Sequence, residues 1–426
     1  MRYYLLTLGC PKNVADSDRL ERLLREAGHS PASAKGADML IVNTCGFIDA
    51  AKEESINAIL KLALKKREGQ RLVVAGCLTQ LYADELLSEV PEIDDVFGVE
   101  AWAKVAALAG KAKTNVDTKK GGAVARRASA YLKIADGCNA RCAFCLIPRI
   151  KGRLHSEPVD EVVVEAKRLA AEGARELVLV AQDSTSYGRD LALTDGLASL
   201  LERLARDVPE VAWLRLMYAY PGHVSPRLLE AMASLPQVCH YLDIPLQHAA
   251  PSVLQRMRRP YDVAETRRML ERLHRAMPDV ALRTTFLVGF PGETEADFQS
   301  LVDFVREERF DHVGAFPFSP QQGTPAASMA DQVPERTKRR RYRELMEVAR
   351  EVSLARNREL IGGETTVLVE SQRADGDGDV FVGRTYRDAP EVDGLVICRG
   401  SASPGELRRV RVTEALPYDV VAEPVE

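Results

Sequence analysis

The chain has 426 residues, a net charge of −4 and 46% hydrophobic residues, which is enough for two or three domains that each bury a core. Its eight cysteines are too sparse for a disulfide scaffold, so we expect a cytoplasmic protein with reduced thiols. No apolar stretch reaches the length of a transmembrane helix, which argues against a membrane protein.

The first third of the chain alternates short apolar runs with helical patterns. The apolar runs predict strands at residues 3–8, 39–42, 72–75 and 95–97. The periodic segments between them predict helices at residues 16–27, 48–66 and 80–87. This alternation is typical of a parallel α/β sheet.

One cysteine follows each of the first three predicted strands. These residues, Cys10, Cys45 and Cys77, are called the N-terminal trio below. Because the carboxyl ends of parallel strands share one edge of a sheet, the three thiols could converge there and bind an iron–sulfur cluster. The alternative is three unrelated buried thiols.

Residues 110–130 are polar, rich in Lys and Arg, and contain Gly121-Gly122, so they predict an exposed connection between domains. A second series of strands and helices follows. Its apolar runs predict strands at residues 131–135, 176–181, 213–218, 241–244, 282–288 and 312–316. About six parallel strands with crossover helices favour a closed or partly closed barrel, whose chemistry lies at the strand carboxyl ends.

The first strand of this barrel runs into a second set of cysteines. Cys138, Cys142 and Cys145, called the loop trio below, lie within eight residues of one another. Three thiolates on one short loop can bind three irons of a 4Fe–4S cluster and leave the fourth iron open to a small molecule. A zinc half-site is the alternative, but no further Cys or His lies at finger spacing, His155 being the nearest.

The last part of the chain changes character. Residues 335–360 predict a long charged helix, and short β-rich runs follow, including residues 366–370 and 380–384. A small five-stranded β-barrel is the expected fold. We therefore expect three domains, at residues 1–115, 126–360 and 363–426.

Charge in the last domain bears on its partner. Residues 363–426 contain 13 acidic and 7 basic residues, a balance that suits a basic protein better than RNA. Asp388, Glu391 and Asp393 are the acidic residues expected to contact such a partner. A basic run at residues 338–343 has Glu335, Glu344 and Glu347 nearby on the same predicted helix and is expected to be a solvated face. The alternative is contact with ribosomal RNA.

Several stretches carry a resemblance to a known family. The loop trio resembles the signature of the radical S-adenosylmethionine (SAM) enzymes, and the whole chain resembles their methylthiotransferase family, which has a terminal TRAM-type barrel. The resemblance implies an N-terminal methylthiotransferase domain with an auxiliary cluster, a radical-SAM barrel and a TRAM-type recognition domain. The matching stretches are residues 9–13, 43–48, 75–78, 241–248 and 288–294.

The branches of this family differ in substrate. One methylthiolates an adenosine of transfer RNA beside the anticodon, and the RimO-type branch methylthiolates an aspartate of small-subunit ribosomal protein S-twelve. Pro11-Lys12 and residues 388–394 resemble the RimO-type branch. The transfer-RNA enzyme is the nearest alternative, and an iron–sulfur redox or sensor protein is a distant one.

The resemblance also implies the chemistry and the cofactors. A 4Fe–4S cluster on the loop trio would cleave SAM, and the adenosyl radical would remove a hydrogen atom from the aspartate β-carbon. A radical is needed because the proton of this C–H bond is far too weakly acidic for a side-chain base. A second 4Fe–4S cluster on the N-terminal trio would deliver sulfur, and a second SAM would supply the methyl group. Partners would be the ribosomal protein, free or in the ribosome, and a low-potential electron donor such as a flavodoxin or a ferredoxin.

Five further residues are predicted to lie against SAM. Phe144 matches the aromatic residue that the family places beside adenine. The other candidates stand at the ends of barrel strands, where SAM would bind: Gln182, Asp183, Gly289 and Glu293. Each of these four could equally cap a strand or form a turn.

Overall fold

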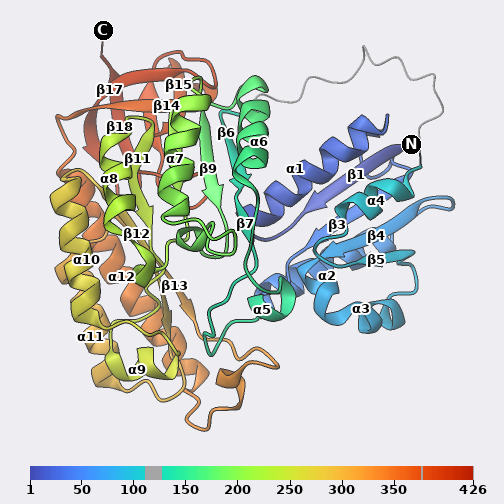
Figure 1. Cartoon of the computed structure of the whole chain (residues 1–426), viewed down its shortest axis with the longest axis horizontal. Helices are drawn as coiled ribbons and strands as arrows, with labels where there is room; N and C mark the ends of the chain where they lie inside the picture. The colour runs from blue at the N-terminus through green and yellow to red at the C-terminus, as the bar shows by residue number, and fades with distance from the viewer. Residues whose placement is uncertain (111–126, 376–377, 426) are drawn as a thin grey trace.

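The computed structural model describes residues 1–110, 127–375 and 378–425. It contains a five-stranded sheet, a six-stranded sheet and a small closed barrel, arranged from blue through green and orange to red in Figure 1. These elements confirm the predicted fold class. Most of the predicted connection at residues 110–130 and the boundaries at residues 115 and 126 lie outside the described residues. No helix in the described ranges combines the length and the apolar character needed to cross a membrane.

The N-terminal sheet is parallel throughout and has the strand order β2-β1-β3-β4-β5. Alternate residues of its strands are buried on opposite faces, under α1 and α4 on one face and α2 and α3 on the other. Burial on both faces explains the continuous apolar runs of the sequence. The elements are β1 (Arg2–Thr7), α1 (Pro11–Glu26), β2 (Ser30–Pro31), β3 (Met39–Thr44), α2 (Asp49–Ala63), β4 (Arg71–Gly76), α3 (Cys77–Glu89), β5 (Asp95–Phe97) and α4 (Trp102–Leu108).

Helix α1 begins five residues earlier than the sequence pattern predicted. Pro11 occupies its first turn, where the fixed φ of proline is compatible with a helix and its missing N–H is not needed. The apolar periodicity starts only later in the helix, which is why the pattern alone missed this turn. The early start places Cys10 at the N-cap of α1.

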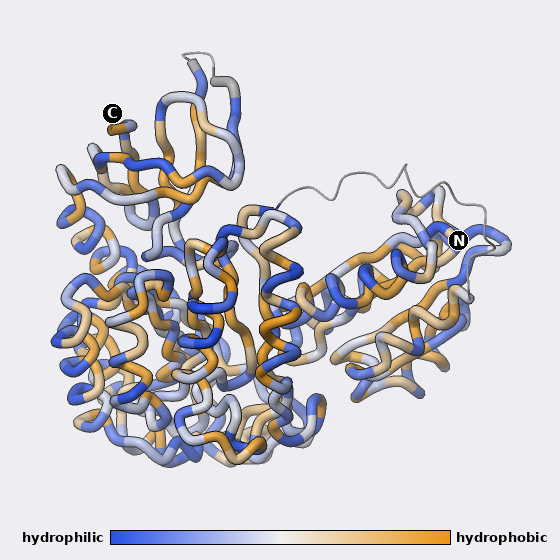
Figure 2. The backbone as a smooth tube through the Cα atoms, turned by 45° about the horizontal axis from the view of Figure 1, so that its top comes forward, coloured by the Kyte–Doolittle hydropathy of each residue, from blue (hydrophilic) through white to orange (hydrophobic). Residues whose placement is uncertain are grey.

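The central sheet is an open six-stranded parallel barrel with the order β13-β12-β11-β10-β9-β6. Figure 2 shows hydrophobic residues, in orange, concentrated along the strands and on the sides of the surrounding helices. Its strands are β6 (Ser129–Lys133), β9 (Glu176–Val180), β10 (Trp213–Leu216), β11 (Val238–Asp243), β12 (Ala281–Val288) and β13 (His312–Pro317). Its helices are α5 (Ile147–Ile150), α6 (Val159–Ala171), α7 (Gly196–Asp207), α8 (Pro226–Ser234), α9 (Pro251–Arg256), α10 (Val263–Ala276), α11 (Glu295–Glu308) and α12 (Glu335–Arg358), with a small hairpin of β7 (Ala135–Asp136) and β8 (His155–Ser156).

The C-terminal barrel closes in the order β14-β15-β16-β18-β17. Its five strands bury a compact apolar core that includes Val367, Phe381 and Val410. The strands are β14 (Glu364–Asp375), β15 (Gly378–Arg384), β16 (Val396–Arg399), β17 (Leu407–Ala415) and β18 (Val420–Pro424).

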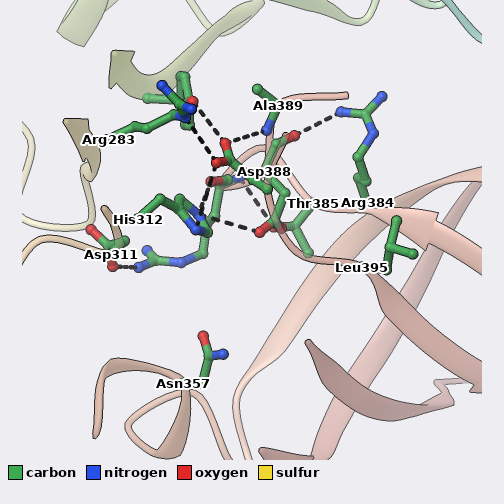
Figure 3. A network of polar contacts seen from close by, with 12 residues as sticks. Arg283, Asp311, His312, Asn357, Arg384, Thr385, Asp388, Ala389 and Leu395 are labelled. Carbon is green, nitrogen blue, oxygen red and sulfur yellow. Dashed lines mark hydrogen bonds and ion pairs between the residues drawn. The ribbon is translucent and has the colours of Figure 1, made fainter. Parts of the chain in front are cut away.

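The segment between β15 and β16 attaches this small barrel to the central one. Asp393 accepts hydrogen bonds from Arg283 Nε at 3.1 Å and from the Tyr241 hydroxyl at 2.7 Å, and its side chain is 1% exposed. Asp388 faces His312, and burial raises the pKa of Asp388. Figure 3 shows Arg283 and His312 pointing toward this segment.

This burial corrects one expectation from the sequence. Asp388 and Asp393 are committed to contacts within the chain and are not free to bind a protein partner, whereas Glu391 is exposed. The acidic composition of residues 363–426 therefore overstates the negative charge that this barrel presents to solvent.

A fully buried ion triad secures the same junction. Glu176, the first residue of β9, accepts hydrogen bonds from Arg215 and from Arg384 at 2.6 Å each. Burial alone would raise the pKa of Glu176, but the two guanidinium groups outweigh it and hold the pKa at about 2. The triad joins the central barrel to Arg384, the last residue of β15.

Replacing Glu176 by Gln should therefore destabilise the protein by about 3–5 kcal/mol, because two buried guanidinium groups lose their counter-charge. Since the folded pKa lies below the ordinary value of about 4.3, this contribution should be complete above pH 5 and fade as the pH falls toward 2. Urea unfolding measures the loss. Glu172→Gln, at the exposed partner of Arg168, is the matched control and should cost less than about 1 kcal/mol; equal losses in the two variants would contradict the role of the triad.

Candidate functional site

The N-terminal trio lies at the carboxyl ends of three adjacent strands. Cys10 caps α1 after β1, Cys45 follows the last residue of β3, and Cys77 opens α3 directly after β4. Neighbouring strands are about 4.8 Å apart, so one edge of the sheet brings the three cysteines together. The helix N-termini at Cys10 and Cys77 favour negative charge on these sulfurs.

Glycines permit this close approach. Gly9 has φ +94°, and a Cβ at this position would lie 2.5 Å from Cys45 Cβ. A Cβ on Gly46 would lie 2.8 Å from Leu78 Cα. Any larger residue at either position would push the cysteine loops apart.

Asn13 ties the loops of the N-terminal trio together. Its Nδ2 donates to Leu8 O at 2.7 Å and to Thr44 O at 3.0 Å, and its Oδ1 lies 4.0 Å from Cys77 Sγ. Asn43 in turn donates to Asn13 O at 2.9 Å. Both asparagines stand in the stretches that carry the family resemblance, but the sequence alone assigned them no role.

The loop trio lies between the hairpin strand β7 and helix α5. Backbone amides donate to two of its sulfurs, from Ala140 to Cys138 and from Ile147 to Cys145, at 3.4 Å each. Gly137 has φ +72°, and a Cβ there would lie 2.1 Å from Arg153 O. Thiolate sulfurs that accept backbone N–H bonds are a donor set that suits an iron–sulfur cluster.

Two backbone hydrogen bonds hold this loop against the barrel. The Ala143 amide donates to Met257 O at 3.0 Å, and Ala143 O accepts from the Ala326 amide at 2.9 Å. The loop trio is therefore attached to segments that follow α9 and β13, far away in the sequence. This double attachment fixes the loop over the carboxyl ends of the barrel strands.

Arg259 is a cation of this site that the sequence pattern did not reveal. Its guanidinium lies 4.8 Å from the Tyr220 ring centroid and 6.0 Å from that of Phe144. Burial raises the pKa of Cys138 and raises that of Cys145 to about 12, and the positive charge of Arg259 opposes both shifts. Arg259 can thus offset part of the negative charge that thiolate ligands would bring into this region.

Burial has the same effect in the N-terminal trio. It raises the pKa of Cys45 and raises that of Cys77 to about 12, where the charge of Lys151 opposes the shift. Burial therefore favours the protonated form of the Cys45 and Cys77 thiols. Metal binding would have to displace their protons.

The two cysteine trios belong to units joined by a buried ionic cluster. Asp16 of α1 pairs with Lys133 and with Lys151, the latter at 3.2 Å, and Asp136 pairs with the same lysines at 3.2 and 3.0 Å. Burial would raise the pKa of Asp136, but the lysines hold it at about 2. This cluster fixes the N-terminal sheet against β6, β7 and the loop trio.

The predicted SAM residues Gln182 and Asp183 are both engaged within the chain. Gln182 Nε2 donates to Asp136 Oδ1 at 2.7 Å, while its buried Oε1 has no hydrogen-bond partner among the described residues. Asp183 is buried, accepts from the hydroxyls of Thr185 and Ser186, and lies 2.9 Å from His223 Nδ1. Gln182 Oε1 therefore keeps an unpaired acceptor among the described residues, whereas both oxygens of Asp183 already accept hydrogen bonds.

Glu293 braces the turn that follows β12. Its Oε2 accepts from the amides of Gly289 at 2.7 Å and Phe290 at 3.2 Å, and its Oε1 accepts from Arg341 at 2.7 Å. His248 Nε2 lies 3.4 Å from the same carboxylate. The carboxylate of Glu293 is therefore occupied by the chain itself.

Gly289 lies in the turn that Glu293 braces, and Phe144 packs beside it. Gly289 has φ +72°, and a Cβ there would lie 2.4 Å from Lys338 Cγ. The Phe144 ring meets the Phe290 ring edge-on, with centroids 6.3 Å apart. These contacts support the turn, and SAM contact by Phe144, Gly289 or Glu293 stays a prediction.

The basic run at residues 338–343 is only partly a solvated face. Lys338 and Arg341 are 5% and 4% exposed, since Lys338 donates to Phe318 O at 2.8 Å and Arg341 reaches Glu293. Arg339 and Arg340 are exposed and pair with glutamates. The sequence pattern could not distinguish these two sets.

A cavity of about 620 Å³ opens beside the loop trio. Cys138, Asp183, Tyr220, His223 and Arg259 are among its lining residues. A larger cavity, of about 770 Å³, lies between α1, β6 and the C-terminal barrel and contains none of the predicted cluster or SAM residues. We therefore assign the chemistry to the neighbourhood of the loop trio.

The described ranges contain no three His, Cys, Asp or Glu side chains grouped closely enough to hold a single metal ion. That each cysteine trio binds an iron–sulfur cluster stays a prediction.

Three family profiles match consecutive parts of the chain. Residues 2–98 match the uncharacterized protein family UPF0004, residues 132–305 match the radical SAM superfamily, and residues 361–425 match the TRAM domain.

Curated relatives match along the whole length. The chain is 46% identical to the ribosomal protein uS12 methylthiotransferase RimO of Chloroflexus aurantiacus, covering 99% of each chain. It is also 46% identical to the RimO of Anaeromyxobacter sp. strain Fw109-5, covering 100% of this chain and 93% of the relative, and 41% identical to that of Geobacter sulfurreducens.

Solved structures share the fold. The radical SAM methyltransferase TsrM from Kitasatospora setae, with tryptophan and a SAM analogue bound, superposes with a TM-score of 0.58 over 88% of this chain and 79% of its own, at 15% identity.

Proposed function

Because the chain belongs to the RimO family of radical SAM methylthiotransferases, we propose that it methylthiolates the β-carbon of an aspartate in ribosomal protein uS12. The observation that carries this proposal is identity of 41–46% over nearly the entire chain to proteins of that name. Similarity over the full length matters here. The radical chemistry depends mainly on the barrel, whereas we expect substrate specificity to depend on all three domains.

We infer that the loop trio holds one 4Fe–4S cluster with SAM and that the N-terminal trio holds a second. When bound, the first cluster supplies the electron that cleaves SAM. The chain contributes the thiolate ligands, the amides that donate to Cys138 and Cys145, and the counter-charge of Arg259. The buried cluster of Asp16, Lys133 and Lys151 would keep the two cofactor sites in fixed register.

The proposed partners are uS12, either free or within the ribosome, and a low-potential electron donor such as a flavodoxin or a ferredoxin. We place the reaction in the cytoplasm, where ribosomal proteins are assembled. The relatives named for uS12 support this substrate, and Pro11-Lys12 beside the first cysteine agrees with it.

Deletion of the gene tests the substrate in cells. Ribosomal protein uS12 from the parent strain should be heavier than uS12 from the deletion strain by one methylthio group in place of hydrogen, and digested transfer RNA should be unchanged. Unmodified uS12 in the parent together with loss of a methylthioadenosine on deletion would overturn the proposal in favour of the transfer-RNA enzyme.

A further inference from the structure

Lys12 is a cation between the N-terminal trio and the central barrel. It stands two residues after Cys10, in the first turn of α1. Its half-buried side chain crosses to the barrel, where Nζ lies 3.6 Å from the centroid of the Tyr218 ring. In the described part of the chain, it forms no ion pair and no hydrogen bond with a side chain.

Tyr218, whose ring contacts the Lys12 ammonium, adopts a strained backbone. It follows β10 at the carboxyl end of the barrel and has φ +62°, a conformation that bulky residues rarely adopt. Two contacts hold it there: its carbonyl accepts from the Ser184 amide at 3.0 Å, and its amide donates to Asp243 Oδ2 at 3.2 Å. Such strain persists where the surroundings enforce it, and it concentrates at functional sites.

Asp243 and Asp136 are the carboxylates whose charge acts on Lys12, and both already have other cations. Asp243 is paired with Arg283 at 2.9 Å, and Arg283 also binds Asp393 of the C-terminal segment. Asp136 is paired with Lys133 and Lys151. The ammonium of Lys12 therefore has donors available for an anion that enters between the trio and the barrel.

We propose that Lys12 is the receptor for the side-chain carboxylate of the substrate aspartate. This inference rests on the proposed function. The aspartate carboxylate is bonded directly to the β-carbon that is modified, so an ion pair with Lys12 would hold that carbon close to Cys10 and the N-terminal trio. The Tyr218 ring fixes the ammonium by a cation–π contact. An adenosine base has no carboxylate and would gain nothing from this ion pair.

The test compares substrates that differ by one charge. Anaerobically reconstituted protein with SAM is titrated with uS12 and with uS12 whose target aspartate is replaced by Asn. Wild-type protein should prefer the aspartate form, and Lys12→Met should weaken binding of that form roughly ten- to hundredfold, the worth of a charged hydrogen bond. Binding of the Asn form should change little. Lys12→Arg, which keeps the charge, should keep the preference for aspartate.

Lys52→Met is the matched control. Lys52 also lies over a tyrosine ring, with Nζ 5.5 Å from the Tyr82 centroid, but it already has Asp49 at 3.3 Å and Gln321 at 2.6 Å as partners. The Lys52→Met variant should therefore keep the wild-type preference for the aspartate form of uS12.

Three outcomes would overturn the role of Lys12. Loss of iron from Lys12→Met would mean that the lysine is needed for cluster binding. Equal loss of affinity for the Asp and Asn forms of uS12 would mean that Lys12 does not recognise the carboxylate charge. Wild-type protein that binds neither form would contradict the proposed function, and the role of Lys12 with it.

Discussion

Replacement of Cys138, Cys142 and Cys145 together by Ala should abolish reductive cleavage of SAM. The three sulfurs lie on one loop that is fixed to the barrel at Ala143, and no other cysteine in the described residues shares this loop. Loss of this ligand set would remove the proposed cluster and with it the electron for SAM. Release of 5′-deoxyadenosine in the presence of dithionite, measured without substrate, should fall to background.

Iron content provides a second readout of the same variant. The reconstituted wild-type protein should hold about eight irons, in two 4Fe–4S clusters, and the variant about half of that. Cys239→Ala is the matched control, since this thiol is buried in the barrel core away from both trios. Continued SAM cleavage, or the same iron content as the wild type, would contradict the assignment of the loop trio.

Replacement of Cys10, Cys45 and Cys77 by Ala should have a different effect. SAM cleavage should remain measurable, because these residues belong to the N-terminal sheet and not to the loop proposed to hold the SAM cluster. Formation of methylthiolated uS12 should cease, because the proposed site for sulfur delivery is lost. Mass analysis of uS12 and of 5′-deoxyadenosine in one reaction separates these two activities.

The outcome of that experiment distinguishes two arrangements of the site. If methylthiolated uS12 still forms at the wild-type rate, the N-terminal trio has no part in sulfur delivery. If SAM cleavage disappears as well while iron falls only by half, the two trios are coupled, and the ionic cluster at Asp16 is the structural link to examine.

Much of the fold could be predicted because buried parallel strands appear in the sequence as continuous apolar runs. Residues 39–42 and 72–75 are covered by helices on both faces, so their side chains are all apolar and the strands are easily recognised. The approach of Cys10, Cys45 and Cys77 followed from the same topology, because adjacent parallel strands end at one edge.

The electrostatic part of the site was harder to predict. Asp388 and Asp393 appeared as surface charge, yet their counter-charges His312 and Arg283 come from strands of the central barrel. Arg259 carries no local signal, because its importance comes from contact with a loop more than one hundred residues earlier. The sequence shows how many charged residues a domain has, but only the fold determines which of them form ion pairs.

The strain at Tyr218 was likewise invisible in the sequence. A left-handed tyrosine has no compositional signature, since it depends on hydrogen bonds to Ser184 and Asp243 from neighbouring strand ends. Lys12 stood in a stretch that resembled the family, but its position over Tyr218 could be found only from the packing of α1 against the barrel.

The most direct test of the proposed function is a competition in one reaction. Purified, reconstituted protein receives SAM, a reductant, unmodified uS12 and unmodified transfer RNA in equal amounts, and both products are analysed by mass spectrometry. We predict that uS12 gains one methylthio group, that fragmentation places the group on an aspartate, and that the transfer RNA is unchanged. Methylthiolation of transfer RNA with unmodified uS12 would contradict the proposed function.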